Sequence, residues 1–369
     1  MSAPTLNSSS VKEAAAAVGF DACGIAAAAP LTEEEWGYDE WLRNGYQADM
    51  AFMEQHRDMR RDPSLLVPGA QSVIVVLLGY KPSQHMQGDA RIAQYAYGED
   101  YHERIKRMLY QLIAAIRQRY PDFEAKPCVD TVPISDKQWA RRAGLGWIGR
   151  NTLLVNPSLG SYCNIGELVT SYPADRYDTP LENGCGDCRA CTDACPNHAL
   201  SERRANALVL PSQSMVTTEG SNHALSERRA NSFAMPSQSM VTTEGSNKAL
   251  THSSIQALTH SSIQAFKHSQ IPLLDANRCA SYHTIENRAE TLPPDIHLSG
   301  YAFGCDICQL VCPYNQTAAV RYTLTDERKS QLEALADADP AAFRRATKHT
   351  ALSRIRHTQW LRNRNQRET

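Results

Sequence analysis

The chain has 369 residues, which is enough for two or three domains with a sizeable core. Its 38 basic and 40 acidic residues give a formal net charge of −2, so no global field indicates nucleic-acid binding. Residues 1–10 lack the apolar segment of a signal peptide, and no apolar run reaches the roughly eighteen residues that a membrane span needs. We therefore expect a cytoplasmic protein without membrane contacts, in which eleven cysteines favour metal ligation over disulfides.

Residues 1–178 have the pattern of a domain with both helices and strands. Apolar periodicity predicts helices over 11–19, 33–53, 103–120 and 137–143. Strands are predicted over 72–78, 125–132, 153–155 and 167–171. The first strand is apolar throughout and should be buried on both faces. Gly19 and Gly144 should end the helices that precede them. The helix over 103–120 has an apolar face made of Ile105, Met108, Leu109, Leu112, Ile113 and Ile116.

The stretch 144–149 reads Gly-Leu-Gly-Trp-Ile-Gly, which is close to the spacing of a dinucleotide-binding loop. Such a loop follows a strand and opens a helix, whereas this stretch follows a predicted helix. We therefore do not expect a dinucleotide site there.

Two cysteine-rich stretches define a second part of the chain, residues 179–322. The first has the spacing Cys-x2-Cys-x2-Cys-x3-Cys-Pro, and in bacterial iron–sulfur proteins the fourth cysteine of such a run binds the other cluster. We assign one [4Fe–4S] cluster to Cys185, Cys188, Cys191 and Cys312. We assign a second cluster to Cys195, Cys279, Cys305 and Cys308. Pairs of Cys-x2-Cys units also bind zinc, but a zinc site does not need the x2-x2-x3-Pro run.

A repetitive insert at about 201–270 interrupts the cysteine pattern. Residues 197–221 recur as 222–246 with differences only at 207–210, and two copies of Ala-Leu-Thr-His-Ser-Ser-Ile-Gln follow within 249–264. Such near-identity is unlike a diversified solenoid, and the composition is polar. We expect a tandem duplication that is mostly loop or disordered chain, with a functional polar hairpin as the alternative.

The C-terminal region, residues 323–369, becomes basic and should be helical. Two interpretations stay open, a solvated helical tail or a surface that contacts phosphate groups. The amphipathic piece 351–363 could pack through Leu352, Ile355 and Trp360.

Several motifs in one order resemble those of epoxyqueuosine reductases, cobalamin-dependent enzymes of queuosine maturation in tRNA. Besides the two cysteine stretches, the matching segments are 61–63, 66–70, 97–102, 129–133, 143–151, 160–161 and 166–168. The similarity extends from about residue 11 to 363 outside the insert. The insert is not typical of the family, and some members continue into a helical-repeat domain where this chain ends.

The resemblance implies a nitroreductase-like α+β domain over 1–178 that binds cobalamin and is related to reductive dehalogenases. It implies a ferredoxin-like domain with two [4Fe–4S] clusters over 179–322 and a short helical region over 323–369. The clusters would pass electrons from an external low-potential donor to the cobalt, whose reduced form reacts with the epoxide of epoxyqueuosine in tRNA. We expect a monomer.

Asp130 matches the proton donor of that family, with Asp136 as a nearby competitor. An acid that works near neutral pH would need a pKa raised by burial. From the residues alone, Asp130 could also be a turn residue at the end of a strand. The resemblance places cobalamin near Arg61, Tyr97, Tyr101, Asp130, Gly149, Asn151, Ser161 and Glu167. It suggests tRNA contacts from Arg354, Arg356 and Arg362.

The stretch 295–300 fits D-x-H-x-x-G, the motif that supplies a cobalt-binding histidine in cobalamin mutases. That motif belongs on a Rossmann-like domain, whereas this one lies just before Cys305. We interpret it as a coincidence and expect His297 to be replaceable.

Two other classes of protein compete with the enzyme. The cysteine pattern alone would fit a dicluster ferredoxin-type electron carrier with a partner-binding domain, which needs no cobalamin pocket. A reductive dehalogenase would share the cofactors, but we would expect an export signal, which the sequence does not show.

Overall fold

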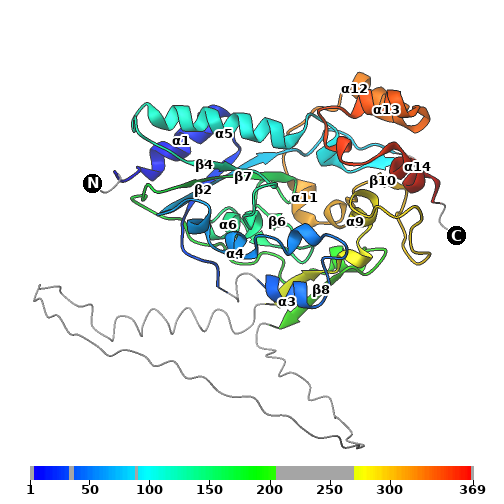
Figure 1. Cartoon of the computed structure of the whole chain (residues 1–369), viewed down its shortest axis with the longest axis horizontal. Coiled ribbons are helices and arrows are strands. Elements are labelled where there is room, and N and C mark those ends of the chain that lie inside the picture. Colours follow the sequence, from blue (N-terminus) through cyan, green and yellow to red (C-terminus); the bar gives the residue numbers. More distant parts are fainter. Residues whose placement is uncertain (1–3, 33–36, 88–89, 205–269, 367–369) are drawn as a thin grey trace, which may run out of the picture. The chain divides into compact units, whose positions relative to one another are not determined.

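The structure is a computed structural model that describes residues 4–32, 37–87, 90–204 and 270–366 (Figure 1). Its contacts divide the chain into one compact unit formed by Met1–Arg203 with Ile271–Thr369, and a second unit, Arg204–Gln270. The predicted domain boundaries near 178 and 322 both lie inside the first unit, and the three-domain division stays a prediction. The predicted loop or disorder of the insert lies largely outside the described residues.

A four-stranded antiparallel sheet forms the centre of the first unit, in the order β1-β2-β7-β4. Its strands are β1 (Ala22–Ala27), β2 (Ser72–Gly79), β7 (Cys163–Thr170) and β4 (Lys126–Cys128). All residues of β2 are buried, as predicted, because β2 pairs on both edges and is covered on both faces. Three two-stranded sheets pair β3 (Arg91–Ile92) with β10 (Tyr301–Phe303), β5 (Trp147–Ile148) with β6 (Leu154–Val155), and β8 (Leu200–Arg204) with β9 (Gln270–Leu274).

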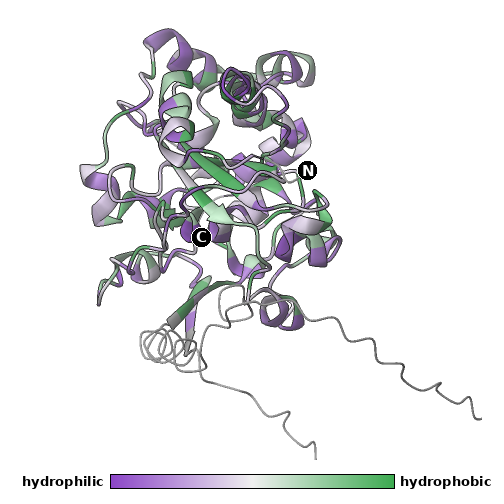
Figure 2. Ribbon diagram, turned by 90° about the vertical axis from the view of Figure 1, so that its left-hand side faces the viewer, coloured by the Kyte–Doolittle hydropathy of each residue, from purple (hydrophilic) through white to green (hydrophobic). Residues whose placement is uncertain are grey.

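Helices cover the two faces of the four-stranded sheet (Figure 1). On one face lie α1 (Ser8–Val18) and α5 (Tyr101–Arg117), and the other face is covered by α6 (Asp136–Arg142). The six apolar residues predicted to face the core from α5 are all buried there. Hydrophobic strands at the centre of the unit are flanked by more hydrophilic segments (Figure 2). The mixed α and β architecture is confirmed.

Several predicted elements are shorter in the structure. The predicted helix 33–53 is reduced to α3 (Tyr38–Arg43) and the 3-10 turn Ala51–Met53, because Gly45 and Ala48 between them adopt positive φ angles. Residues 33–36 lie outside the described part. The predicted strand 125–132 contains only β4, because Asp130 has φ 45° and turns the chain away from the sheet. Gly19 ends α1 with φ 104°, as expected.

Short helices carry the second half of the unit. They are α7 (Ala190–Asp193), α9 (Ala280–Ile285), α10 (Ile307–Leu310), α11 (Pro313–Thr317), α12 (Asp326–Glu333), α13 (Pro340–Thr347) and α14 (His357–Asn365). A further short helix, α4 (Arg57–Arg61), lies in the first half. Leu352, Ile355 and Trp360 are buried in a core with Ile92 and Tyr97. The C-terminal region therefore packs against the first domain and is not a solvated tail. In the described part of the chain, no helix is long and apolar enough to cross a membrane.

The pairing of β8 with β9 yields a test of the insert. Because these strands are hydrogen-bonded to each other, their outer ends can be joined by a short linker at little cost in loop-closure entropy. We predict that replacing residues 205–269 by a short glycine–serine linker leaves the iron content and the melting temperature close to those of the full chain. Loss of iron from the shortened protein would show that the insert supports the cluster region.

Candidate active site and cluster cysteines

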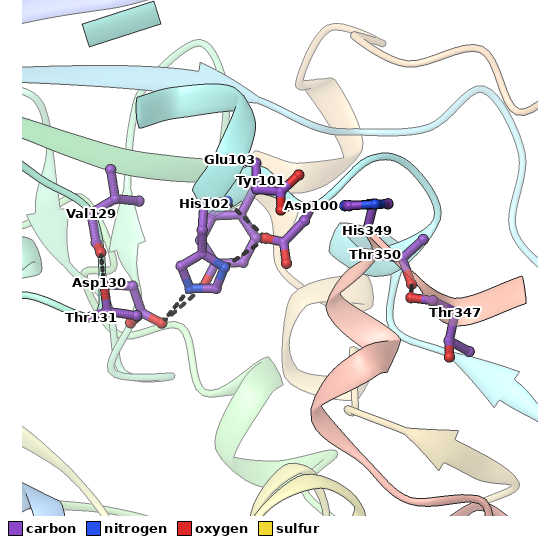
Figure 3. Close-up of polar contacts among 10 residues, drawn as sticks. All are labelled: Asp100, Tyr101, His102, Glu103, Val129, Asp130, Thr131, Thr347, His349 and Thr350. Carbon is purple, nitrogen blue, oxygen red and sulfur yellow. Dashed lines mark hydrogen bonds and ion pairs between the residues drawn. The ribbon is translucent and has the colours of Figure 1, made fainter. Parts of the chain in front are cut away.

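Asp130 lies at the centre of a hydrogen-bonded group that links the loop after β4 to the start of α5 (Figure 3). The hydroxyl of Tyr101 donates to Asp130 Oδ2 over 3.0 Å, and His102 Nε2 lies 2.9 Å from the same oxygen. The other ring nitrogen, His102 Nδ1, lies 2.7 Å from Asp100 Oδ1. An imidazolium can donate from both nitrogens, so a protonated His102 satisfies both carboxylates at once.

Mutual interaction sets the pKa values of this group. Burial alone would raise the pKa of Asp130, but the hydrogen bond and charge of His102 outweigh it and hold that pKa below its ordinary value. Burial would lower the pKa of His102, but its hydrogen bonds to Asp130 and Asp100 outweigh burial and raise it. Asp130 therefore lacks the raised pKa that an acid working alone near neutral pH would need. The mobile proton belongs to the His102–Asp130 pair and lies mainly on the imidazole.

The start of α5 holds His102 in place. Asp100 is the N-cap residue, and its Oδ1 accepts both the backbone N–H of His102 and the contact from the ring. The rings of Tyr101 and His102 stack with centroids 3.9 Å apart. Sequence reasoning missed the role of His102, because Asp-Tyr-His at a helix start has the pattern of an ordinary cap.

Two further carboxyl groups lie next to Asp130. Asp136 is the first residue of α6, and Glu167 lies on β7 opposite Cys128 of β4. Glu167 is fully buried, and burial followed by the charge of Asp136 raises its pKa well above the ordinary value. Burial and then the charge of Asp130 raise the pKa of Asp136 to about 7. Lys137 Nζ donates to the carbonyl of Thr152 over 2.8 Å, and burial lowers its pKa.

One residue of the C-terminal region acts on the same site. Arg354 Nε donates to Glu286 Oε1 over 2.6 Å, and the Arg354 charge contributes to lowering the pKa of Asp130. The packing of 323–369 against the first domain therefore adds a positive charge near the acid. This influence was not part of the predicted role of Arg354 in tRNA binding.

The eight predicted cluster cysteines lie on turns and helix ends in the second half of the unit. Cys279 and Cys312 are the N-cap residues of α9 and α11, and Cys191 and Cys308 lie on α7 and α10. Among the described residues, no three His, Cys, Asp or Glu side chains converge closely enough to hold a single metal ion. A cubane cluster places four irons between its thiolates and so calls for a wider arrangement than one ion does.

The thiols interact electrostatically in the two predicted sets. Burial and then the charges of Cys185 and Cys312 raise the pKa of Cys191 to about 11. In the other set, burial, Cys279 and Cys195 contribute to raising the pKa of Cys305 to about 12. Burial raises the pKa of Cys312, with smaller effects from the charges of Cys185 and Cys188. Burial and then the charges of Cys305 and Cys279 raise the pKa of Cys308. Four thiolates crowded together in this way need a positive metal centre to offset their charge.

The eight predicted cobalamin contacts have different surroundings. Tyr101 and Asp130 touch each other, and half of the Asp130 side chain is exposed. Arg61 Nε donates to the carbonyl of Leu31. Buried residues make up the rest of the set, namely Tyr97, Gly149, Asn151, Ser161 and Glu167. Their role toward a corrin stays a prediction and would need these positions to be uncovered, because Tyr97, Asn151, Ser161 and Glu167 are each at most 4% exposed.

Buried polar residues of the predicted set join the two halves of the unit. The Ser161 hydroxyl donates to Gln309 Oε1 over 3.0 Å, and its backbone N–H donates to Asn315 Oδ1. Gln309 follows Cys308 on α10, and Asn315 lies on α11 just after Cys312. Ser161 therefore connects the sheet domain to the cysteine stretch.

The predicted tRNA residues and the His297 motif are also placed. Arg356 is exposed at the start of α14. Arg362 instead donates to the carbonyls of His283 and Asn287 over 2.7 and 3.0 Å, so its guanidinium has a structural role. His297 is exposed, and its backbone exchanges hydrogen bonds with the Asn197 side chain.

Two family models match the chain. "Epoxyqueuosine reductase QueG, DUF1730" matches residues 60–131, and "4Fe-4S double cluster binding domain" matches residues 262–315. An epoxyqueuosine reductase from Cyclobacterium marinum is 32% identical over 95% of this chain and 92% of its own length. The chain belongs to the epoxyqueuosine reductase family. It is therefore an oxidoreductase, as predicted, and residues 262–315 within its second half match a double-cluster domain.

Solved epoxyqueuosine reductases share the fold. One from Bacillus subtilis, whose catalytic aspartate loop is swung out of the active site, has a TM-score of 0.67 at 22% identity and covers 96% of this chain and 79% of its own. Another, bound to an epoxyqueuosine-modified tRNA-Tyr stem loop, has a TM-score of 0.65 at 22% identity with the same coverage.

Titration can test whether His102 and Asp130 share a proton. We predict that Asp130→Asn lowers the pKa of His102 by about one pH unit, because the imidazolium loses one of its two carboxylates. Proton NMR of the imidazole against pH measures the change. Asp122→Asn, an exposed aspartate ahead of β4, is the matched control. An unchanged His102 titration in Asp130→Asn would contradict the paired arrangement.

Proposed function

We propose that the chain reduces epoxyqueuosine to queuosine at the wobble position of tRNA, with cobalamin at the site of Asp130 and electrons supplied through two [4Fe–4S] clusters. The proposal is supported most by one observation. A single chain of this family joins a proton-holding His102–Asp130 pair to eight thiols that interact in two sets. An electron carrier would need the thiols but has no use for the acid.

The proposed clusters follow the two sets of thiols. Cys185, Cys188, Cys191 and Cys312 would bind one, and Cys195, Cys279, Cys305 and Cys308 the other. Cys188 is the exposed member of these eight. We place the entry of electrons from an external low-potential donor there, because transfer between proteins favours a cluster close to the surface. The charge of Cys191 also reaches Cys308, so the two sets lie close enough to exchange electrons.

The cobalamin site is proposed on the open side of Asp130, in a domain that would have the nitroreductase-like fold. Desolvation is the largest influence on Asp130 although half of its side chain is exposed, so protein surrounds the carboxylate and leaves one side accessible. Polar groups that suit a ligand rich in amides gather there, since Tyr101, His102 and Lys137 lie next to it. Cobalamin, when bound, supplies the reducing chemistry at the epoxide.

The residues of the chain supply the proton and the orientation. Asp130 would donate to the epoxide oxygen and take a proton from His102 Nε2, 2.9 Å away. Asp100 holds the imidazole in the orientation that points Nε2 at Asp130. The turn at Asp130, with φ 45°, lies in a loop after a strand of only three residues, so it can move with the substrate.

The tRNA would lie along the C-terminal region and the site. Arg356 is exposed and Arg354 lies between Glu286 and Asp130, so both can face a phosphate. A cytoplasmic monomer fits a substrate of this kind. The alternative, a dicluster ferredoxin-type carrier, would show two clusters without bound cobalamin and without tRNA binding.

The variant Asp130→Asn tests whether Asp130 is the proton donor of the reaction. We predict that this variant retains about eight irons per chain and an EPR signal of bound Co(II) without axial nitrogen splitting. Its turnover of epoxyqueuosine in tRNA should fall on the order of a hundredfold, because general-acid catalysis is lost. Asp122→Asn is again the control. Normal turnover by Asp130→Asn would remove its acid role, and absence of bound cobalamin in the unmodified protein would favour the carrier.

Two arginines of the C-terminal region are expected to differ in role, Arg356 in tRNA binding and Arg362 in the stability of the fold. We predict that Arg356→Gln weakens tRNA binding and reduces the salt slope of the affinity by about one. By contrast, Arg362→Gln should destabilise the protein by about 2 kcal/mol, because buried carbonyls lose a charged donor. Filter binding at several salt concentrations and urea unfolding measure the two effects. A salt slope that falls in Arg362→Gln but not in Arg356→Gln would reverse this assignment.

A further inference from the structure

The described part of the chain holds a pair of carboxyl groups, the buried Glu167 and the half-buried Asp136, that the steps above do not use. Glu167 lies on β7 with Val169 and Ile165 on the same face, so its side chain points toward α6 and the apolar core there. Asp136 begins α6 at the edge of that core. A carboxyl group in such a layer needs a polar partner or a proton.

The polar group that faces the Glu167 carboxyl is the carboxyl of Asp136. Among the described residues, no N–H or O–H group donates to either oxygen of Glu167 or to Oδ1 of Asp136. The two carboxyl groups lie within hydrogen-bonding contact of one another. Two ionised carboxylates have only acceptors to offer and repel each other at this range. One proton between them turns the contact into an O–H···O hydrogen bond.

The charged groups around the pair do not replace that proton. Lys137 faces Asp136 and Asp130, but its ammonium donates to the Thr152 carbonyl. Cys128, opposite Glu167 on β4, is also buried, and burial with the charge of Glu167 raises its pKa. Asp130 adds a further negative charge, and His102 pairs with Asp130 on its other side. No cation among these reaches Glu167, so the proton stays the partner of its carboxylate.

The pair connects directly to the acid. The backbone of Asp130 donates a hydrogen bond to Asp136, so the two residues lie next to each other. The next step rests on the proposed function, because the stoichiometry of that reaction requires a second proton. Both epoxide carbon–oxygen bonds break, the oxygen leaves as water, and an alkene forms, which consumes two electrons from the external donor and two protons. The His102–Asp130 pair holds one mobile proton.

We propose that Asp136 and Glu167 share one stored proton and pass it through Asp136 to the Asp130 carboxylate after Asp130 has given up the first. The oxygen that left the epoxide then receives its second proton from Asp130 and departs as water. The pair, left with two negative charges, regains a proton from solvent through Asp136, which is only half-buried. Glu167 is a positioning residue in this scheme, because it acts through Asp136.

The test uses Glu167→Gln and Asp136→Asn in the full-length protein, with Glu124→Gln as the matched control at an exposed position ahead of β4. Infrared spectroscopy of the unmodified protein at neutral pH should show the carbonyl stretch of a protonated carboxylic acid, shifted in D2O. Each variant should lose this band, because an amide now donates to the remaining carboxylate and lowers its pKa. The control should keep it.

Single-turnover product formation is then followed against pH in the same proteins. In both variants the alkaline limb should move to lower pH, with rates at pH 8 reduced on the order of tenfold and iron content unchanged. An unmodified protein without the infrared band, or variants with an unshifted pH profile, would overturn the proposal. Absence of alkene product from the unmodified protein would instead overturn the proposed function, while the infrared band still decides whether the pair holds a proton.

Discussion

The energetic constraint that shapes this protein is the cost of placing like charges together away from water. Around the acid, Asp100, Asp130, Asp136 and Glu167 lie close together, and His102 and Lys137 with their protons make that density of carboxylates possible. The two sets of four thiols face the same cost, which in their case metal centres can offset. Protonation of a carboxylate and binding of a metal by thiolates both reduce this cost.

The sheet supplies the rigidity that these arrangements need. Strand β2 is buried throughout and pairs along its whole length with β7, which fixes where Glu167 lies beneath α6. The neighbouring β4 is short, and the chain leaves the sheet at Asp130. The site therefore combines a carboxyl on a central strand with one on the loop that follows β4. Such a division would suit the proposed store, which keeps its proton, and a donor that must reach the substrate.

The sequence predicted the parts whose signal is periodic or spaced. The apolar face of α5 and the buried β2 follow from patterns within short segments. What it could not predict depends on how distant segments meet. The contact of Asp136 with Glu167 requires the position of α6 over β7, and the internal role of Arg362 requires α9 beneath α14. The helix expected over 33–53 failed for a local reason, because Gly45 and Ala48 adopt positive φ angles.

The C-terminal region contacts the elements that position the acid. Its helices are held by Trp360 and Leu352 in a core shared with the segment before α5, and that same segment leads to Asp100, the residue that orients His102. The backbone N–H of Asp100 donates to the carbonyl of His349, so the cap of α5 is fixed directly by this region. Arg354 then brings its charge toward Asp130 from the same side. The position of the C-terminal region therefore contributes to the pKa of Asp130 as well as to the orientation of His102.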